Sequence, residues 1–383
     1  MLTLYQTITT VCILLVFLNL LNNLRLLRKP PLEGPLPPNL PKVSVLVPAR
    51  NEERNIEKCV SSLLAQDYPA KEIIVLDDNS TDRTAMIVEA IAARSRDLKL
   101  IRGKPLPPGW IGKNYACYQL AEAAQGEWFL FTDADTVHSP FSVSASLKAA
   151  LEEKADFLSL IPHIETVSFW EKVLLPVIPF GLLCFWPLGL MNSIPYYRAV
   201  MALGPFMMVR REVYRRAGGY EAIRNNIVDD IALAREVKKA GGRVTIMDGT
   251  DLVSVRFYRN FREIWDGLSK SIFGALDYSL TTAALYIIAG WSLFIYPYLL
   301  VFQSLAFREF HLLSFWVPSF HIALAWLMYY KVARRFKLSP FTPVFSALTV
   351  ALTLLMIINS VRCSFLGKGL AWKGRYYNVG VRR

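Results

Sequence analysis

Charged residues, paired cysteines and glycine-rich nucleotide loops are all scarce in this sequence. Charged side chains make up 19% of the 383 residues and the mean hydropathy is +0.31, which excludes a disordered protein and an ordinary soluble enzyme. The five cysteines and four histidines are scattered and no CxxC pair occurs, which argues against a disulfide framework and a zinc site. No GxGxxG follows the first predicted strand, which argues against a dinucleotide cofactor.

The first uncharged segment covers residues 1–24, and Arg25, Arg28 and Lys29 follow it directly. Its apolar part is long enough to cross a bilayer. The positive charges come after the apolar run and no small-residue cleavage site follows, so the pattern differs from a signal peptide. Residues 1–29 therefore predict an uncleaved anchor in the cell inner membrane, with its N-terminus outside and the next domain in the cytoplasm.

Three further uncharged runs lie at residues 278–307, 311–330 and 338–361. The first two predict a hairpin of spans, whereas a full third span would place the basic residues after it outside, against the positive-inside bias. A re-entrant or interfacial segment is therefore favoured for the third run, and residues 278–383 predict a membrane region of two to three spans with a basic tail. Residues 331–383 hold ten basic residues and no acid, which leaves +2 of the formal charge of +12 for the rest. This distribution indicates a topology signal and attraction to anionic lipid headgroups, and argues against a nucleic-acid partner.

Residues 41 to about 256 have the apolar pattern of a soluble domain, in which short apolar runs, the first two of them rich in Val and Ile, alternate with helical patterns. Strands are predicted at residues 42–47, 72–76, 98–101 and 127–132, and helices at 51–66, 81–93 and 113–124. This alternation predicts an α/β domain with a parallel sheet flanked by helices, whose ligands bind at the carboxyl ends of the strands.

Residues 173–197 carry no charge, but four prolines interrupt them too often for a simple spanning helix. Aromatic side chains are favoured at membrane interfaces, and the segment and its flank hold several, namely Trp170, Phe180, Phe185 and Trp186. The interpretation is a membrane-interface segment over about residues 170–206. A broken pair of buried helices is the alternative.

Asp133 and Asp135 end the apolar run of residues 128–131. Carboxylates two residues apart in an extended chain point the same way. Mg²⁺ and Mn²⁺ are commonly held by one or two carboxylates plus substrate phosphates. The pair therefore predicts metal ligands and a diphosphate substrate, although either residue could instead cap the helix that follows.

Adjacent carboxylates, Asp77 and Asp78, end the second predicted strand. A turn accounts for the residues after them but not for the pair itself, one member of which could accept hydrogen bonds from a nucleobase or a ribose. The exit of the first strand lies beside this pair in the predicted topology. It offers Pro48, Arg50 and Glu52 as further donor-binding candidates.

A third acidic pair, Asp229 and Asp230, precedes a helical pattern, where it could also be a simple acidic helix N-terminus. Arg259 and Arg262, three residues apart, would share a helix face and could clamp a diphosphate, or form a membrane-surface stripe. Lys113, beside a glycine in a proline-rich loop, is a further candidate phosphate contact.

The order and spacing of five segments closely resemble the family 2 glycosyltransferases of GT-A fold, and this resemblance implies such a domain over residues 42–270. They are residues 43–52 (VSVLVPARNE), 72–84 (EIIVLDDNSTDRT), 126–135 (GEWFLFTDAD), 218–220 (GGY) and 228–233 (VDDIAL). Two more segments look like the membrane-bound branch that contains carotenoid-acid and hopanoid-associated glucosyltransferases, with ceramide glucosyltransferase a more distant relative. These are residues 109–114 (GWIGKN) and 372–375 (WKGR).

The resemblance implies inverting transfer from a nucleotide-diphosphate sugar with Mg²⁺ or Mn²⁺. Asp77 would match the family's uridine-contacting aspartate, and Asp133 and Asp135 its metal and diphosphate motif. The family's catalytic base is the second residue of a Glu-Asp pair, which corresponds to Asp230, with Asp229 in the place of the glutamate.

Arg259 and Arg262 fit the cationic positions of a family motif whose tryptophan is replaced here by Glu263, which argues against a processive polymer synthase. The leading hypothesis is therefore an enzyme that moves one hexose, probably glucose from UDP-glucose, onto a lipid hydroxyl or carboxyl at the cytoplasmic leaflet. A polyprenyl-phosphate glycosyltransferase is the alternative within the enzyme class. A membrane carrier or scaffold with a degenerate nucleotide-binding domain is the alternative outside it, but it would not need carboxylates at three separate element ends.

Overall fold

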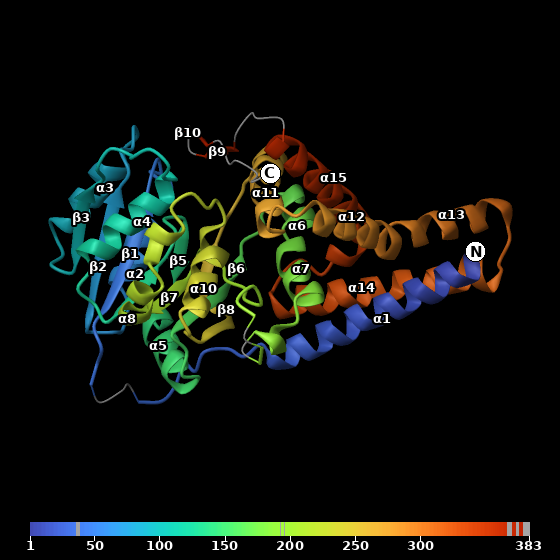
Figure 1. Ribbon diagram of the computed structural model, residues 1–383, viewed down its shortest axis with the longest axis horizontal. Helices are drawn as coiled ribbons and strands as arrows, with labels where there is room; N and C mark the ends of the chain where they lie inside the picture. The colour runs from blue at the N-terminus through green and yellow to red at the C-terminus, as the bar shows by residue number, and fades with distance from the viewer. Residues whose placement is uncertain (36–38, 192, 195, 366–369, 373–374, 378–383) are drawn as a thin grey trace.

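The computed structural model describes residues 1–35, 39–191, 193–194, 196–365, 370–372 and 375–377. Its strands are β1 Val43–Ala49, β2 Lys71–Asp77, β3 Leu98–Arg102, β4 Trp128–Phe131, β5 Thr136–His138, β6 Phe157–Ile164, β7 Met207–Arg210, β8 Val244–Val255, β9 Leu370–Trp372 and β10 Arg375–Tyr377. Eight of them form one sheet in the order β3-β2-β1-β4-β7-β6-β8-β5, and β9 and β10 form a separate antiparallel pair (Figure 1).

The helices cover both faces of this sheet and continue into an extended bundle. They are α1 Leu2–Leu26, α2 Ile56–Leu64, α3 Thr84–Ala92, α4 Gly112–Ala123, α5 Ser142–Glu152, α6 Phe169–Leu174, α7 Val177–Phe185, α8 Arg211–Arg216, α9 Gly219–Ala222, α10 Asp229–Lys239, α11 Phe261–Ala275, α12 Leu280–Phe294, α13 Tyr296–Phe307, α14 Val317–Arg335 and α15 Ser346–Phe365. Shorter helical turns are η1 Leu188–Leu190, η2 Leu312–Trp316 and η3 Thr342–Phe345.

The predicted parallel α/β sheet is confirmed for the first four strands. β1 pairs in parallel with β2 and β4, and β2 with β3. β1 and β4 are buried almost throughout, as expected for central strands covered by helices on both faces. In α2 the buried positions Ile56, Cys59, Val60 and Leu63 follow the helical spacing of one apolar face.

The second half of the sheet departs from a purely parallel arrangement. β7 runs antiparallel to both β4 and β6, β6 and β8 are parallel, and β5 closes the edge antiparallel to β8. This order places the carboxyl end of β4 at the middle of the sheet, with the exits of β1 and β2 beside it. The acidic strand ends predicted from the sequence therefore gather on one side of the sheet.

The helix predicted from residue 51 begins later than expected, at Ile56. Asn51 has a φ of 53°, and its side-chain oxygen accepts a hydrogen bond from the Thr81 backbone N–H at 2.8 Å. The Glu52 backbone N–H in turn donates to the Thr84 hydroxyl at 2.7 Å. The polar groups of residues 51–52 and 81–84 therefore pair with each other. These hydrogen bonds take the place of the helical turn that was expected at residue 51.

Four helical stretches are long and apolar enough to cross a membrane, and they suggest that the chain is membrane-associated. They cover Leu2–Leu26, Leu280–Phe307, Leu312–Arg335 and Thr342–Phe365. α1, α13 and α14 extend together away from the sheet (Figure 1). At the sheet end of this bundle, basic residues pair with β8: Arg335 lies 2.7 Å from Asp248, and Lys337 lies 2.6 Å from Asp251.

α15, which contains most of the third uncharged run, packs against α11 and α12. Ser346 at its start lies 3.1 Å from the Tyr298 hydroxyl, and the Ser360 hydroxyl near its end accepts from the Phe273 backbone N–H at 3.1 Å. Before this run, Lys337 pairs with Asp251 of β8. After it, Arg375 pairs with Asp78 of the sheet domain. A re-entrant or interfacial course for residues 338–361 stays a prediction, and both flanks of the run contact the same domain.

The proline-interrupted segment folds as α6, α7 and η1. The rings of Phe180 and Tyr329 stack at 3.8 Å, and the Asn23 side chain donates to the Leu183 carbonyl at 2.8 Å. Phe180 is thus buried between helices and does not lie on a membrane surface, which corrects the expectation for this residue and favours the broken-helix alternative locally. The placement of residues 170–206 in a membrane interface stays a prediction.

Candidate active site

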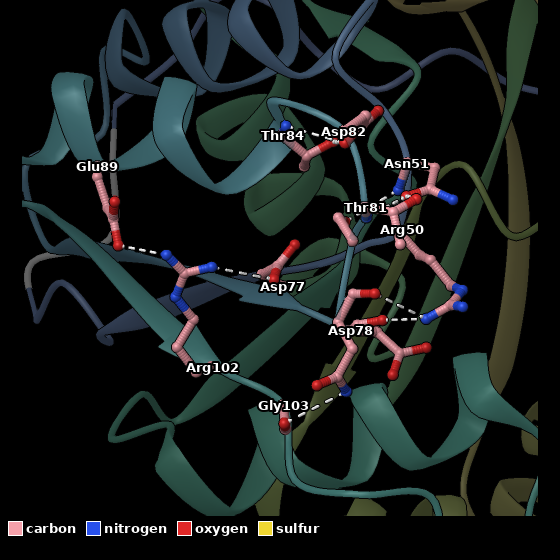
Figure 2. Close-up of polar contacts among 12 residues, drawn as sticks. Arg50, Asn51, Asp77, Asp78, Thr81, Asp82, Thr84, Glu89, Arg102 and Gly103 are labelled. Atoms are coloured by element: carbon pink, nitrogen blue, oxygen red, sulfur yellow. Dashed lines mark hydrogen bonds and ion pairs between the residues drawn. The ribbon is translucent and has the colours of Figure 1, made fainter.

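The first part of the site consists of two loops that follow β1 and β2 and contact each other. The Arg50 guanidinium donates to the backbone carbonyls of Asp78 and Asn79, which fixes the second loop against the first (Figure 2). The predicted donor-binding residues Arg50 and Asp78 are therefore brought together by hydrogen bonds from the Arg50 side chain to the main chain of the second loop. Their side chains are positioned before any ligand arrives.

Asp77 and Asp78 point to different surroundings. The buried Asp77 carboxylate accepts a hydrogen bond from Arg102 at 3.2 Å and lies on the β3 side, apart from Arg50 (Figure 2). Its other oxygen, Oδ1, is buried and has no hydrogen-bond partner among the described residues. A buried carboxylate oxygen of this kind suits a donor group from a ligand. The contact with Arg102 was not predicted from the sequence.

Asp78 is held by a residue almost 300 positions away in the chain. The Arg375 guanidinium of β10 forms a two-pronged pair with the Asp78 carboxylate, at 2.6 and 3.1 Å. Asp78 is 4% exposed, so this pair is largely withdrawn from water. The segment around Arg375 carries a family resemblance, but nothing in its sequence predicts this contact.

A polar cavity of about 390 Å³ lies between these loops and the turn after β4. Of the predicted residues, Pro48, Arg50, Glu52, Asp78, Lys113, Asp133 and Asp135 line it. Tyr258, Asp266 and Lys270 also line it and were missed, because residues around α11 are distant in sequence from the strand ends. A cavity of this size, with charged groups converging on it, is suited to a small polar ligand.

The two predicted arginines do not line this cavity. Arg262 has a side chain that is 92% exposed and lies 4.0 Å from Asp266. Arg259 donates to the Asn55 side chain at 3.2 Å, near the start of α2. The structure therefore places Lys270 and Tyr258, and not this pair of arginines, on the cavity wall.

Asp133 and Asp135 lie in the turn between β4 and β5 and both line the polar cavity. Within the part of the chain that the structure describes, no group of three or more His, Cys, Asp and Glu side chains is arranged to hold a metal alone. Two carboxylates that share a cavity fit Mg²⁺ or Mn²⁺, which take further ligands from water and from substrate phosphates. A Cβ at Gly204 would lie 3.3 Å from Asp133 Oδ2 and from Lys113 Nζ, so this glycine keeps the space beside the carboxylate open.

Lys113 links the carboxylates of the site. Its ammonium lies 2.8 Å from Asp133 and 3.4 Å from Asp229. Burial lowers the pKa of Lys113, but the charges of Asp133 and Asp229 outweigh burial and hold that pKa well above its usual value. Lys113 is therefore a fixed positive charge at the centre of the site.

Asp229 and Asp230, at the first turn of α10, have different environments. Asp229 is buried and accepts a hydrogen bond from the Tyr220 hydroxyl at 3.2 Å. Asp230 accepts from the Gly204 backbone N–H at 3.1 Å and faces a large cavity. Burial, and then the charge of Asp229, raise the pKa of Asp230 to about 7. A carboxylate with this pKa can accept a proton near neutral pH.

The large cavity has a volume of about 740 Å³ and shares Lys113 and Asp133 with the polar cavity. Away from Asp230 its walls come mainly from α7, residues 196–205, α11 and α12, and they are mostly apolar. The polar cavity and the mostly apolar cavity thus meet at Lys113 and Asp133, which have opposite charges. Asp230, the carboxylate with the raised pKa, lies beside this junction.

Comparison with known proteins shows similarity to glycosyltransferases. Residues 44–218 match the model described as "Glycosyl transferase family 2". Over 235 residues the chain is 27% identical to the 4,4'-diaponeurosporenoate glycosyltransferase of Staphylococcus aureus strain USA300, and 28% identical to that of strain MRSA252. Each alignment covers 60% of this chain and 60% of the relative, so the chain matches about three fifths of the length of these proteins.

A solved structure has the same fold. The mannosyltransferase of Pyrobaculum calidifontis, in complex with GDP-Man and Mn²⁺, aligns with 93% of this chain and 99% of its own, with a TM-score of 0.53 and 18% sequence identity. The predicted GT-A type of α/β fold is confirmed.

Proposed function

We propose that this chain, a glycosyltransferase with a family 2 domain over residues 44–218, moves a single hexose from a nucleotide-diphosphate sugar onto a membrane lipid. The observation that carries the proposal is the junction of the two cavities. Lys113 and Asp133 line both, and Asp230 lies on the apolar side of that junction. A polar donor and an apolar acceptor can therefore meet at one point.

The polar cavity would bind the donor. Asp77 and Asp78 lie at the end of β2, where the nucleoside would be held, and Lys113 would pair with the diphosphate. A divalent metal held by Asp133 and Asp135 would offset the negative charge that develops on the departing diphosphate. UDP-glucose is the proposed donor, with Mg²⁺ or Mn²⁺ as the metal.

Asp230 would act as the base in a single displacement. The acceptor oxygen bonds to the anomeric carbon while the bond from that carbon to the diphosphate oxygen breaks, and the acceptor proton passes to Asp230. Attack from the face opposite the departing diphosphate inverts the anomeric carbon. The Gly204 and Ile231 backbone N–H groups, which donate to Asp230 at 3.1 and 2.7 Å, hold the carboxylate in this position.

A lipid acceptor fits the apolar walls of the large cavity and the four candidate membrane helices. The relatives from Staphylococcus aureus are named for a lipid-like acceptor, diaponeurosporenoate. The acceptor would present a hydroxyl or a carboxyl at the cytoplasmic leaflet of the inner membrane, because positive charges after α1 favour a cytoplasmic domain.

One feature favours a second candidate, an isoprenoid phosphate acceptor. Arg198 and Arg235 line the large cavity and both pair with Asp277, and the buried Nε of Arg235 has no hydrogen-bond partner among the described residues. Arginine suits planar recognition of phosphate and carboxylate groups. An anionic acceptor group could take the place of part of the Asp277 contact.

Sealed inside-out membrane vesicles that contain the protein test the function. With radiolabelled UDP-glucose and Mn²⁺ they are expected to place label in extractable lipid, whereas right-side-out vesicles are not. Mild acid should release label from a glycosyl phosphate and mild base from an ester, whereas a simple glycoside resists both. No lipid label from UDP-glucose, when another nucleotide sugar labels lipid, would overturn the donor; no label from any nucleotide sugar would overturn the transfer.

The raised pKa of Asp230 leads to an expected pH dependence. Because only the ionised carboxylate can accept the proton, kcat/KM should fall as the pH drops through about 7. Removal of the neighbouring charge in Asp229→Asn should lower the pKa of Asp230 and move this limb to lower pH. The profile is measured at saturating metal, and a limb that stays in place in Asp229→Asn would contradict the assignment.

Arg375→Ala is expected to weaken donor binding. The change leaves the buried Asp78 carboxylate without this partner beside the donor cavity, so the donor KM should rise about tenfold. The matched control is Arg362→Ala, which removes an exposed basic side chain at the end of α15 and should leave KM unchanged. Equal KM values in the two variants would show that the Asp78 pair plays no part in donor binding.

A further inference from the structure

A second apolar cavity of about 510 Å³ lies deeper in the helical region, between α7, α11, α12, α14 and α15. Among the described residues that line it none is charged, and its polar lining groups are hydroxyls of residues such as Tyr286 and Thr353. Apolar cavities stay dry and bind apolar molecules. The cavity is therefore suited to a hydrocarbon occupant.

This second, deeper cavity shares part of its wall with the large cavity that contains Asp230. Gly181, Ile272 and Tyr286 are among the residues that line both. Asp230 and Lys113 line the large cavity, whereas the second cavity is lined in part by helices that are long and apolar enough to cross a membrane. An extended lipid with one polar end would match this change from charged residues in the large cavity to apolar residues in the second cavity.

Gly181 lies at the shared wall, inside α7. Glycine in a helix interior is unfavourable by about 1 kcal/mol relative to alanine, so helix stability does not explain it. A Cβ added here would meet no atom within 4 Å. A side chain at residue 181 would therefore begin in open space at the wall that the two cavities share.

We infer that the deeper cavity holds the distal tail of the acceptor lipid, and that the open space at Gly181 lets a long tail pass from the catalytic cavity into it. This inference rests on the proposed function and adds the class of acceptor, a lipid with one long extended hydrocarbon chain. It also assigns Gly181 as a residue that sets the length of chain accepted.

The test uses a 16-carbon fatty alcohol with a diazirine at its terminal carbon, and an 8-carbon analogue, on the full chain in phosphatidylcholine nanodiscs. After irradiation, adducts are mapped by mass spectrometry. In the wild type the long probe should label the walls of the deeper cavity, such as Ala289 of α12 and Leu354 of α15, and the short probe should not. In Gly181→Leu the yield of these adducts should fall at least fivefold.

Two controls keep the outcome clear. Ala284→Leu adds the same side chain at an exposed position of α12 and should leave the adducts unchanged. Competition in the wild type, where unlabelled 16-carbon alcohol suppresses the adducts and 8-carbon alcohol does not, gives the same answer without a variant. Equal adduct yields in wild type and Gly181→Leu, or equal suppression by both alcohols, would overturn the inference and indicate a bulk membrane lipid in the cavity. Gly181-dependent adducts with no sugar transfer to any lipid would instead refute the proposed function.

Discussion

Asp230→Asn is expected to lower kcat by about 10²–10⁴-fold, the usual contribution of a positioned general base. Asparagine keeps the size of the side chain and an oxygen that can accept from Gly204, but it cannot take the acceptor proton. The donor KM should change little, because Asp230 lines the apolar cavity and not the donor cavity. Initial rates at varied donor concentration separate the two constants.

The control for this variant is Asp97→Asn, an exposed aspartate just before β3 that lines neither cavity. Wild-type turnover is expected there. Turnover in Asp230→Asn equal to that of the control would remove Asp230 from the mechanism. Asp229→Asn should retain more activity than Asp230→Asn. Asp229 accepts a hydrogen bond from Tyr220 and contacts Lys113, and it does not line the large cavity proposed for the acceptor.

Asp135→Asn is expected to lower kcat/KM by about 10²–10³-fold, the range for loss of one group that stabilises developing charge. The remaining Asp133 is already paired with Lys113, so one carboxylate would be left to hold the metal. A higher Mn²⁺ concentration should restore part of the activity, whereas chelation of metal by EDTA should abolish wild-type transfer. The measurement is a Mn²⁺ titration of kcat/KM in wild type, Asp135→Asn and the Asp97→Asn control.

The same titration can contradict the metal site. If Asp135→Asn reaches half-maximal rate at the Mn²⁺ concentration of the wild type, Asp135 does not contribute to metal binding. Full wild-type activity in EDTA would contradict metal dependence as a whole.

The strand ends could be predicted from the sequence because their signals are local. Apolar runs that stop at Asp78 and Asp133 mark parallel strands, and the carboxyl ends of such strands meet at one edge of a sheet. Lys113 and Asp230 lie at the starts of helical patterns, and these helices pack against β1 and β8 respectively. The structure brings all four residues to the two adjoining cavities.

The contacts that depend on distant segments could not be predicted in this way. Arg375 reaches Asp78, and Arg335 and Lys337 pair with carboxylates of β8, so part of the C-terminal positive charge joins the tail to the sheet domain. The sequence pattern alone attributes that charge to membrane topology and to attraction to lipid headgroups. No local pattern specifies which carboxylate a basic residue far along the chain will meet.

The arginine pair, Arg259 and Arg262, shows how little helical spacing says about the direction of a side chain. Arg259 and Arg262 were predicted to clamp the donor because of their helical spacing, and spacing alone does not fix which way a helix face turns. α11 begins at Phe261 with Asn260 as its cap, and this register exposes Arg262 and places Lys270 on the cavity wall. Their assignment as donor-binding residues stays a prediction that the structure does not support geometrically.

The anomeric configuration of the product tests most directly whether the transfer at the junction of the two cavities is a single displacement. The measurement is the proton NMR spectrum of the glycolipid formed from UDP-α-glucose by the wild-type protein. Inversion predicts a β-linked glucose. An α-linked product would contradict this mechanism, because one displacement from the face opposite the diphosphate cannot retain the configuration of the donor.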